Sequence, residues 1–159
     1  MIRLSRMCDY GVAMLTFLAR DPEAAHSASE IAEATGVPAP MASKILKQLG
    51  RAGLLASHRG VRGGYGLARP TSRITIAEIV EALDGPIALT ACVEEGEGDC
   101  GIERLCPARA NWQRINLAIR QALEGVTLAD MVEAIPSAFL SREEREALER
   151  DRSHRVSGA

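Results

Sequence analysis

The fold of this chain is decided by residues 27–55, SASEIAEATGVPAPMASKILKQLGRAGLL, its most specific backbone pattern. Ser27 or Ser29 can cap a short helix, and Gly36 can end that helix in the tight turn that glycine permits. The apolar face of this helix is expected at Ile31, Ala32 and Ala34. A second helix follows after three or four residues, which predicts a helix-turn-helix.

The second helix is expected from about Pro40 to Ala52, with an apolar side and a basic side. Its apolar side comprises Met41, Ala42, Ile45, Leu46 and Leu49. Its polar side comprises Ser43, Lys44, Lys47, Gln48 and Arg51. A basic exposed face on the second helix favours DNA over a protein partner.

Residues 54–68, LLASHRGVRGGYGLA, predict a β-hairpin because two short apolar runs flank a glycine-rich tip. Glycines let such a tip approach a sugar-phosphate backbone, and Arg59 and Arg62 offer charge and forked donors to phosphates. A hairpin directly after the helix-turn-helix predicts a winged helix.

Two further helices are expected beside this unit. One runs from Ser5 to Ala19, where Gly11 indicates close backbone packing, and the other from Ile74 to Leu83, capped by Thr75. The predicted fold is therefore mainly α: a winged helix-turn-helix with a small β-hairpin wing and, later in the chain, a long dimerisation helix.

Three of the four cysteines lie in residues 91–106, ACVEEGEGDCGIERLC. The acidic and glycine residues between them cannot form a core, so we expect a solvated loop. The spacing leaves enough slack for Cys92, Cys100 and Cys106 to converge on one small inorganic centre. The sequence predicts a metal-ligand loop, and iron–sulfur ligation is the chemistry that it favours.

Other interpretations of the cysteines remain open. A free cysteine is often a small buried hydrophobe, and a cluster-free thiol switch needs no metal. A disulfide requires an oxidising compartment, whereas the chain begins MIRLSRM without an apolar signal run. Structural zinc usually uses paired Cys-x2-4-Cys hooks, which the sequence lacks. Without a redox Cys-x-x-Cys pair or a glycine-rich nucleotide loop, we expect no enzyme and no small-molecule substrate.

Charge is distributed unevenly along the 159 residues, although the net charge is only −2. Residues 1–70 carry nine Lys or Arg against five acidic residues, and residues 71–159 carry ten against sixteen. The basic first half predicts a polyanionic partner. Since no apolar run approaches the length of a membrane span, we expect no membrane association.

Residues 108–123 carry an apolar stripe on a helix that Pro107 is well placed to open. The stripe comprises Trp112, Ile115, Ala118, Ile119 and Leu123. Nothing obvious in the chain covers it, which predicts a homodimer through the same helix of a second copy; ordinary intrachain core is the alternative. A dimer also suits a near-palindromic DNA site.

We therefore expect three parts: a DNA-binding domain at 1–86, a cysteine loop at 87–107, and dimerisation and C-terminal helices at 108–159. In the last part, Thr127 is expected to cap a short helix from Leu128 to Ala134. A charged helix from Ser141 and a disordered end after Ser153 are expected to follow.

These segments together resemble the IscR-like family of bacterial winged-helix transcription regulators, and within it the regulators associated with the SUF iron–sulfur assembly pathway. The resemblance extends to about Met131. Its motifs are RLSRMCDYG, TGVPAPMASKILKQLGRAGLL, SHRGVRGGYGLARP, EIVEALDGPIALT, the cysteine loop and CPARANWQRIN.

The resemblance implies a cytoplasmic homodimer that binds promoter DNA and represses iron–sulfur assembly genes under control of a [2Fe–2S] cluster, or a [4Fe–4S] cluster. It implies cluster ligation by Cys92, Cys100 and Cys106. Base contacts are implied for Ser43 and Lys44 and backbone contacts for the wing arginines, and we also expect DNA contact by Lys47.

The fourth cluster ligand is where the chain departs from IscR. That protein has a histidine three residues after the last cysteine, whereas this chain has Arg109, which cannot deprotonate to bind iron. In nitric-oxide-sensing relatives, a carboxylate in the first helix of the other subunit completes the site, and Asp9 matches that position. Its neighbour Cys8 is the alternative. A cluster-free thiol or nitric-oxide-responsive regulator is the alternative function.

Overall fold

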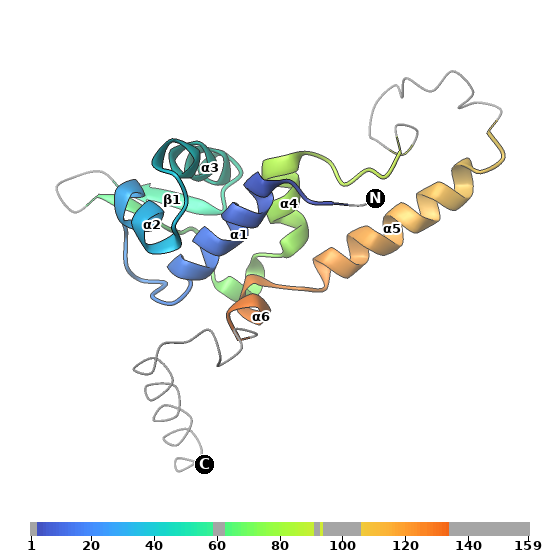
Figure 1. Cartoon of the computed structure of the whole chain (residues 1–159). Coiled ribbons are helices and arrows are strands. Elements are labelled where there is room, and N and C mark those ends of the chain that lie inside the picture. The colour runs from blue at the N-terminus through green and yellow to red at the C-terminus, as the bar shows by residue number, and fades with distance from the viewer. Residues whose placement is uncertain (1–2, 59–62, 91–92, 94–105, 134–159) are drawn as a thin grey trace, which may run out of the picture.

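The computed structural model describes residues 3–58, 63–90, 93 and 106–133, and Figure 1 shows a winged-helix body from which one long helix extends. The mainly α winged helix-turn-helix fold is confirmed. The elements are α1 (Arg6–Leu18), α2 (Ala28–Thr35), α3 (Ala39–Arg51), β1 (Leu55–His58), β2 (Gly64–Leu67), the 3-10 turn η1 (Thr71–Arg73), α4 (Ile76–Asp84), α5 (Arg109–Glu124) and α6 (Leu128–Glu133).

Helix α2 begins at Ser27, the first of the two expected caps. The Ser27 hydroxyl accepts from the Glu30 backbone N–H at 3.2 Å, and a Glu30 carboxylate oxygen accepts from the Ser27 N–H at 2.6 Å. These hydrogen bonds lower the pKa of Glu30. Gly36 ends the helix in the left-handed conformation, with φ of 68°. The turn between α2 and α3 therefore follows from local sequence signals.

The expected apolar face of α2 was wrong at one position. Ile31 and Ala32 are buried, whereas Ala34 is exposed. Two residues along a helix correspond to a rotation of about 200°, so Ala34 points away from the core that Ala32 faces.

Helix α1 lies at the centre of the core and packs against α2, α3, α4 and α6. A Cβ atom at Gly11 would collide with the side chain of Leu83 on α4, which confirms the close packing expected there. Large side chains from both ends of the described chain complete the core. Those that are fully buried include Met14, Leu15, Leu18, Ile31, Ile45, Leu46, Leu49, Leu54, Ile74, Ile79 and Leu128.

The wing is a two-stranded antiparallel sheet whose register runs from Leu55 opposite Leu67 to His58 opposite Gly64. The segment before α2 extends it, since His26 and Tyr65 exchange backbone hydrogen bonds of 3.0 and 2.8 Å. A Cβ atom at Gly64 would collide with the His26 carbonyl, so glycine permits this approach. The wing is thereby attached to the helix-turn-helix.

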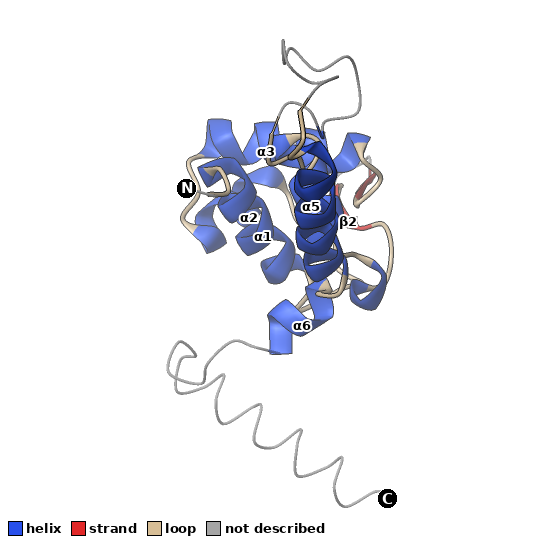
Figure 2. Ribbon diagram, turned by 90° about the vertical axis from the view of Figure 1, so that its right-hand side faces the viewer, coloured by secondary structure: helices blue, strands red, loops and turns tan. Residues whose placement is uncertain are grey.

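Helix α5 extends away from the winged-helix body in Figure 1, and in the turned view of Figure 2 it lies in front of that body. Its C-terminal end is secured by two backbone hydrogen bonds, from Ile76 N–H to the Val126 carbonyl at 2.9 Å and from Leu128 N–H to the Ile74 carbonyl at 2.8 Å. Helix α6 then packs on η1 and α1. The charged helix expected from Ser141 and the disordered end lie outside the described residues.

Candidate nucleic-acid interface and cysteine loop

Helix α3 presents a basic face opposite its buried face. Lys44, Lys47 and Arg51 are exposed and Ser43 is half-buried, at spacings of three and four residues that bring them to one side of the helix. The structure thus gathers three of the five expected DNA-contacting residues on α3. Such a face can meet base edges with Ser43 and Lys44 and the phosphate backbone with Lys47.

The base of the wing is attached to α4 by an ion pair of 3.0 Å between Arg69 and Glu78. Burial raises the pKa of Glu78, but hydrogen bonds from Thr75 and the pairing with Arg69 outweigh it, so the pKa is lowered overall. The remaining two expected DNA contacts, Arg59 and Arg62, are in the wing tip and lie outside the described residues.

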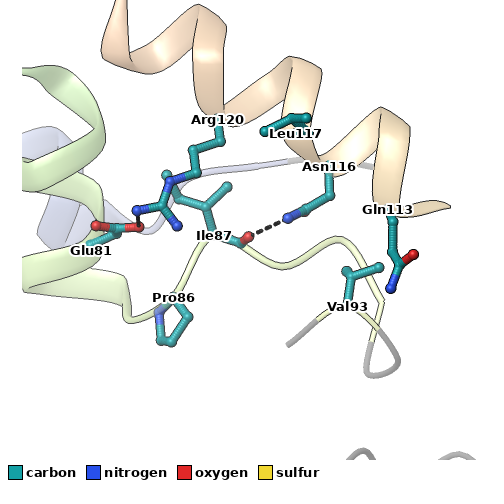
Figure 3. Close-up of a pocket in the computed structure, with 8 residues that line it drawn as sticks. All are labelled: Glu81, Pro86, Ile87, Val93, Gln113, Asn116, Leu117 and Arg120. Carbon is teal, nitrogen blue, oxygen red and sulfur yellow. Dashed lines mark hydrogen bonds and ion pairs between the residues drawn. The ribbon is translucent and has the colours of Figure 1, made fainter. Parts of the chain in front are cut away.

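Of the three loop cysteines, the described residues include Cys106, which is half-buried three residues before α5, whereas Cys92 and Cys100 lie outside them. Within the described ranges, no group of three or more His, Cys, Asp or Glu side chains could hold a metal ion. Val93, the residue after Cys92, is described and lines the same hollow as Gln113 on α5 (Figure 3).

The two candidates for the fourth ligand have opposite environments, although they are adjacent in sequence. Cys8 is fully buried in the core, while Asp9 is exposed on the first turn of α1. Burial, and then the nearby charges of Asp84 and Asp9, raise the pKa of the Cys8 thiol to about 11. A metal binds the thiolate and needs access to it, and the Cys8 thiol is both enclosed by the core and hard to deprotonate.

The start of α1 is joined to the end of α4. The Ser5 backbone N–H donates to a carboxylate oxygen of Asp84 at 3.0 Å, and the Ser5 hydroxyl donates to the other oxygen. The Ser5 hydroxyl also accepts from the Cys8 N–H at 3.2 Å, which caps α1. Since Asp84 comes directly before the segment that leads to the cysteines, helix α1 and the start of that segment are held together.

The segment from Pro86 to Thr90, which we call the incoming arm, passes alongside α5. The Asn116 side chain donates to the Ile87 carbonyl at 2.8 Å and accepts from the Leu89 N–H at 3.1 Å. Arg120, one turn further along, pairs with Glu81 on α4 at 3.1 Å. Figure 3 shows the Asn116–Ile87 hydrogen bond and the Arg120–Glu81 ion pair, which border a hollow of about 480 Å³ between the incoming arm and α5.

Comparison with known families adds the decisive observation. Residues 4–134 match the family model Rrf2, described as iron-dependent transcriptional regulator. The chain belongs to the Rrf2 family. Rrf2 proteins are transcriptional regulators rather than enzymes, so this protein is a DNA-binding transcriptional regulator.

Individual relatives of this Rrf2 regulator agree with the assignment. This chain is 37% identical over 135 residues to protein aau3 of Rhizobium meliloti strain 1021, and the match covers 85% of this chain and 88% of aau3. Two solved structures each have a TM-score of 0.66 and 28% identity. The first is CymR, the global cysteine regulator of B. subtilis, and the match covers 86% of this chain and all of CymR. The second is T. potens IscR, and the match covers 89% of this chain and 93% of IscR. The similarity to IscR confirms the expected family relationship.

In the described part of this Rrf2 protein, none of the helices is both long and apolar enough to cross a bilayer.

Sequence reasoning missed the polar contacts that organise this Rrf2 regulator around its cysteine loop. Asn116 was part of a recognised motif, yet its two partners lie 27 and 29 residues earlier in the chain. Asp84 likewise contacts Ser5, which lies 79 residues earlier in the chain. The sequence offered only a weak signal for the Asn116 contacts. Asparagine has low helix propensity, so its presence within a long helix suggests that its side chain makes a tertiary contact.

Proposed function

We propose that this Rrf2 regulator is a cytoplasmic homodimer that represses promoters of iron–sulfur assembly genes according to the state of a cysteine-ligated iron–sulfur cluster. Cys92, Cys100 and Cys106 hold the cluster, and Asp9 donated across the dimer completes the site. The DNA surface consists of Ser43, Lys44 and Lys47 on α3 and Arg59 and Arg62 in the wing.

The position of Val93 is the observation that carries the cluster proposal. Val93 lies next to Cys92 in sequence and lines the same hollow as Gln113 of α5, while Cys106 comes just before α5. Gln113 is four residues into α5, about 6 Å along the helix axis from its first residue. The residue after Cys92 therefore lies across a hollow from α5, the helix that Cys106 precedes, which supports convergence of the thiolates.

The donor set also fits an iron–sulfur cluster. Five carboxylates in or beside the loop disfavour bare thiolates, and a bound cluster supplies the positive charge that reverses this preference as well as a redox-sensitive centre. Within the protein, Asp84 joins the segment leading to the cysteines to Ser5 and hence to α1. Helix α1 packs on α3, so a change at the loop can reach the recognition helix.

Anaerobic purification tests the proposal directly. The expected product absorbs visible light and contains stoichiometric iron and acid-labile sulfide. Colourless protein with an oxidisable thiol pair would instead support a cluster-free or nitric-oxide-responsive thiol regulator. That second function is favoured by the similarity to CymR, whose structure is described as that of a cysteine regulator, and by the partial exposure of Cys106.

Asp9→Ala is expected to speed removal of the cluster by a chelator about tenfold. Loss of a group that merely supports a metal ligand already weakens metal binding by about this factor, and loss of a ligand should weaken it at least as much. The measurement is the rate at which a chelator bleaches the visible absorbance under anaerobic conditions. Asp21→Ala, at an exposed aspartate beyond the other end of α1, serves as the matched control. An Asp9→Ala protein with wild-type spectrum and bleaching rate would remove Asp9 from the ligand set.

The proposed dimer uses the exposed apolar stripe of α5. Trp112 is 39% exposed and Ile115 is 45% exposed, and none of the α5 residues is fully buried by the described part of the chain. A second copy would cover this stripe, as twofold dimers commonly do with a shared helix.

Ile115→Glu is expected to weaken the dimer by about 2 kcal/mol or more, because it places a charge in the centre of the proposed interface. Sedimentation velocity at micromolar concentration measures the shift towards monomer. Gln121→Glu adds the same charge at an exposed position off the stripe and should leave the dimer intact. Equal sedimentation of the two variants would place the interface elsewhere.

A further inference from the structure

Pro40 places an apolar ring at the N-terminal end of the basic face of α3. It precedes Ser43 by three residues, Lys44 by four and Lys47 by seven, so the four residues lie on the same side of the helix. Pro40 is exposed, as are Lys44 and Lys47. The face that we propose to meet DNA therefore begins with a hydrocarbon ring and continues with polar and charged groups.

The core determines the direction in which this ring points. Val37, just before the helix, and Ala42, in its first turn, are buried, and Met41 packs partly against the core. The Ala42 N–H donates to the Pro38 carbonyl at 2.9 Å, which closes the first turn. Two residues along a helix correspond to a rotation of about 200°, so Pro40 faces away from the core that Ala42 faces. The closed proline ring leaves the side chain few other positions.

A proline ring distinguishes between bases because its side chain carries only carbon. It offers no hydrogen bond to the amino group of cytosine or adenine, or to the carbonyl of guanine. A polar base edge that loses water to the ring without gaining a hydrogen bond is bound less well. The 5-methyl group of thymine instead gains an apolar contact. In a helix-turn-helix, residues near the start of the second helix are the ones that reach base edges.

We propose that Pro40 is a specificity-determining residue of this regulator and packs against the 5-methyl group of a thymine in each half of the DNA site. Lys44 lies about 6 Å further along the helix axis, a distance of about two base pairs in DNA. Because lysine binds the N7 and O6 atoms of guanine, each half-site should contain a thymine within about two base pairs of a guanine. The inference rests on the proposed DNA surface of α3 and is independent of the cluster.

Deoxyuridine tests this contact because it differs from thymidine by the methyl group alone. Full-length protein, in anaerobically purified and apo forms, first selects its preferred sites from DNA duplexes of random sequence. Each thymine of the selected site is then replaced by deoxyuridine in both half-sites, and affinity is measured by fluorescence anisotropy. The variant is Pro40→Gly, which removes the ring. Pro38→Gly is the matched control, at an exposed proline that lies off the basic face.

One thymine position is expected to respond to loss of its methyl group. The affinity of wild type and of Pro38→Gly should fall about fourfold for each half-site, as the loss of one buried methyl group implies. The affinity of Pro40→Gly should change by less than about 1.5-fold, because the ring that covered the methyl group is absent. Circular dichroism should show the same helix content in all three proteins.

The results that would overturn the inference can be told apart by adding Lys47→Ala. If Lys47→Ala lowers affinity, but no thymine responds in wild type or Pro40→Gly responds equally, the inference fails and the DNA surface of α3 stands. If Lys47→Ala binds as wild type does and no response depends on Pro40, the DNA surface and the inference fail together. Failure of both forms of the protein to select any sequence would have the same consequence.

Discussion

Replacement of Cys106 with alanine is expected to abolish cluster binding, so that the anaerobically purified protein is colourless and retains less than about a tenth of the wild-type iron. The physical reason is that an iron–sulfur cluster is held by thiolates, and the loop offers only three of them. Cys106 is half-buried beside α5, where the incoming arm also returns. Iron and acid-labile sulfide per chain are the measurements.

Cys8→Ala is the matched control, since it also removes one thiol. Cys8 is fully buried in the core, and its side chain faces away from solvent. The variant is expected to keep its cluster and to lose about 1 kcal/mol of the free energy of unfolding through the small cavity left behind. Loss of the visible absorbance in Cys8→Ala, with the band retained in Cys106→Ala, would reverse the roles assigned to the two cysteines.

Replacing both Lys44 and Lys47 with alanine in one variant is expected to lower its affinity for promoter DNA about 100-fold at moderate salt. It should also reduce the slope of log affinity against log salt by about one, because Lys47 is expected to neutralise one phosphate and each such contact releases about one counterion. Both side chains are exposed on the basic face of α3, so their removal leaves the core unchanged. Fluorescence anisotropy across a salt series measures both quantities.

The control for the lysine variant is Arg114→Ala, which removes a positive charge from the exposed surface of α5. Its affinity and salt slope should stay close to wild type. A salt slope that does not change in the double lysine variant would mean that α3 does not contact the phosphates, and the DNA surface would have to be sought elsewhere.

The sequence by itself determined the elements of this protein and their order. Ser27 with Glu30 and Thr75 with Glu78 form reciprocal helix caps, and Gly36 ends α2, because each device depends on residues within one helical turn. The basic face of α3 follows from periodicity for the same reason. The sequence wrongly assigned Ala34 to the buried face of α2, because so short a helix has too few turns for its periodicity to define that face.

Only the tertiary structure decided the burial and the long-range contacts of the residues around the proposed site. The resemblance implies Asp9 as the fourth ligand and leaves its neighbour Cys8 as the alternative, and the packing of α1 exposes Asp9 and buries Cys8. Asn116 meets Ile87 and Leu89 only because α5 returns alongside the incoming arm. Such contacts depend on which faces of distant segments meet, and no local pattern of residues encodes that meeting.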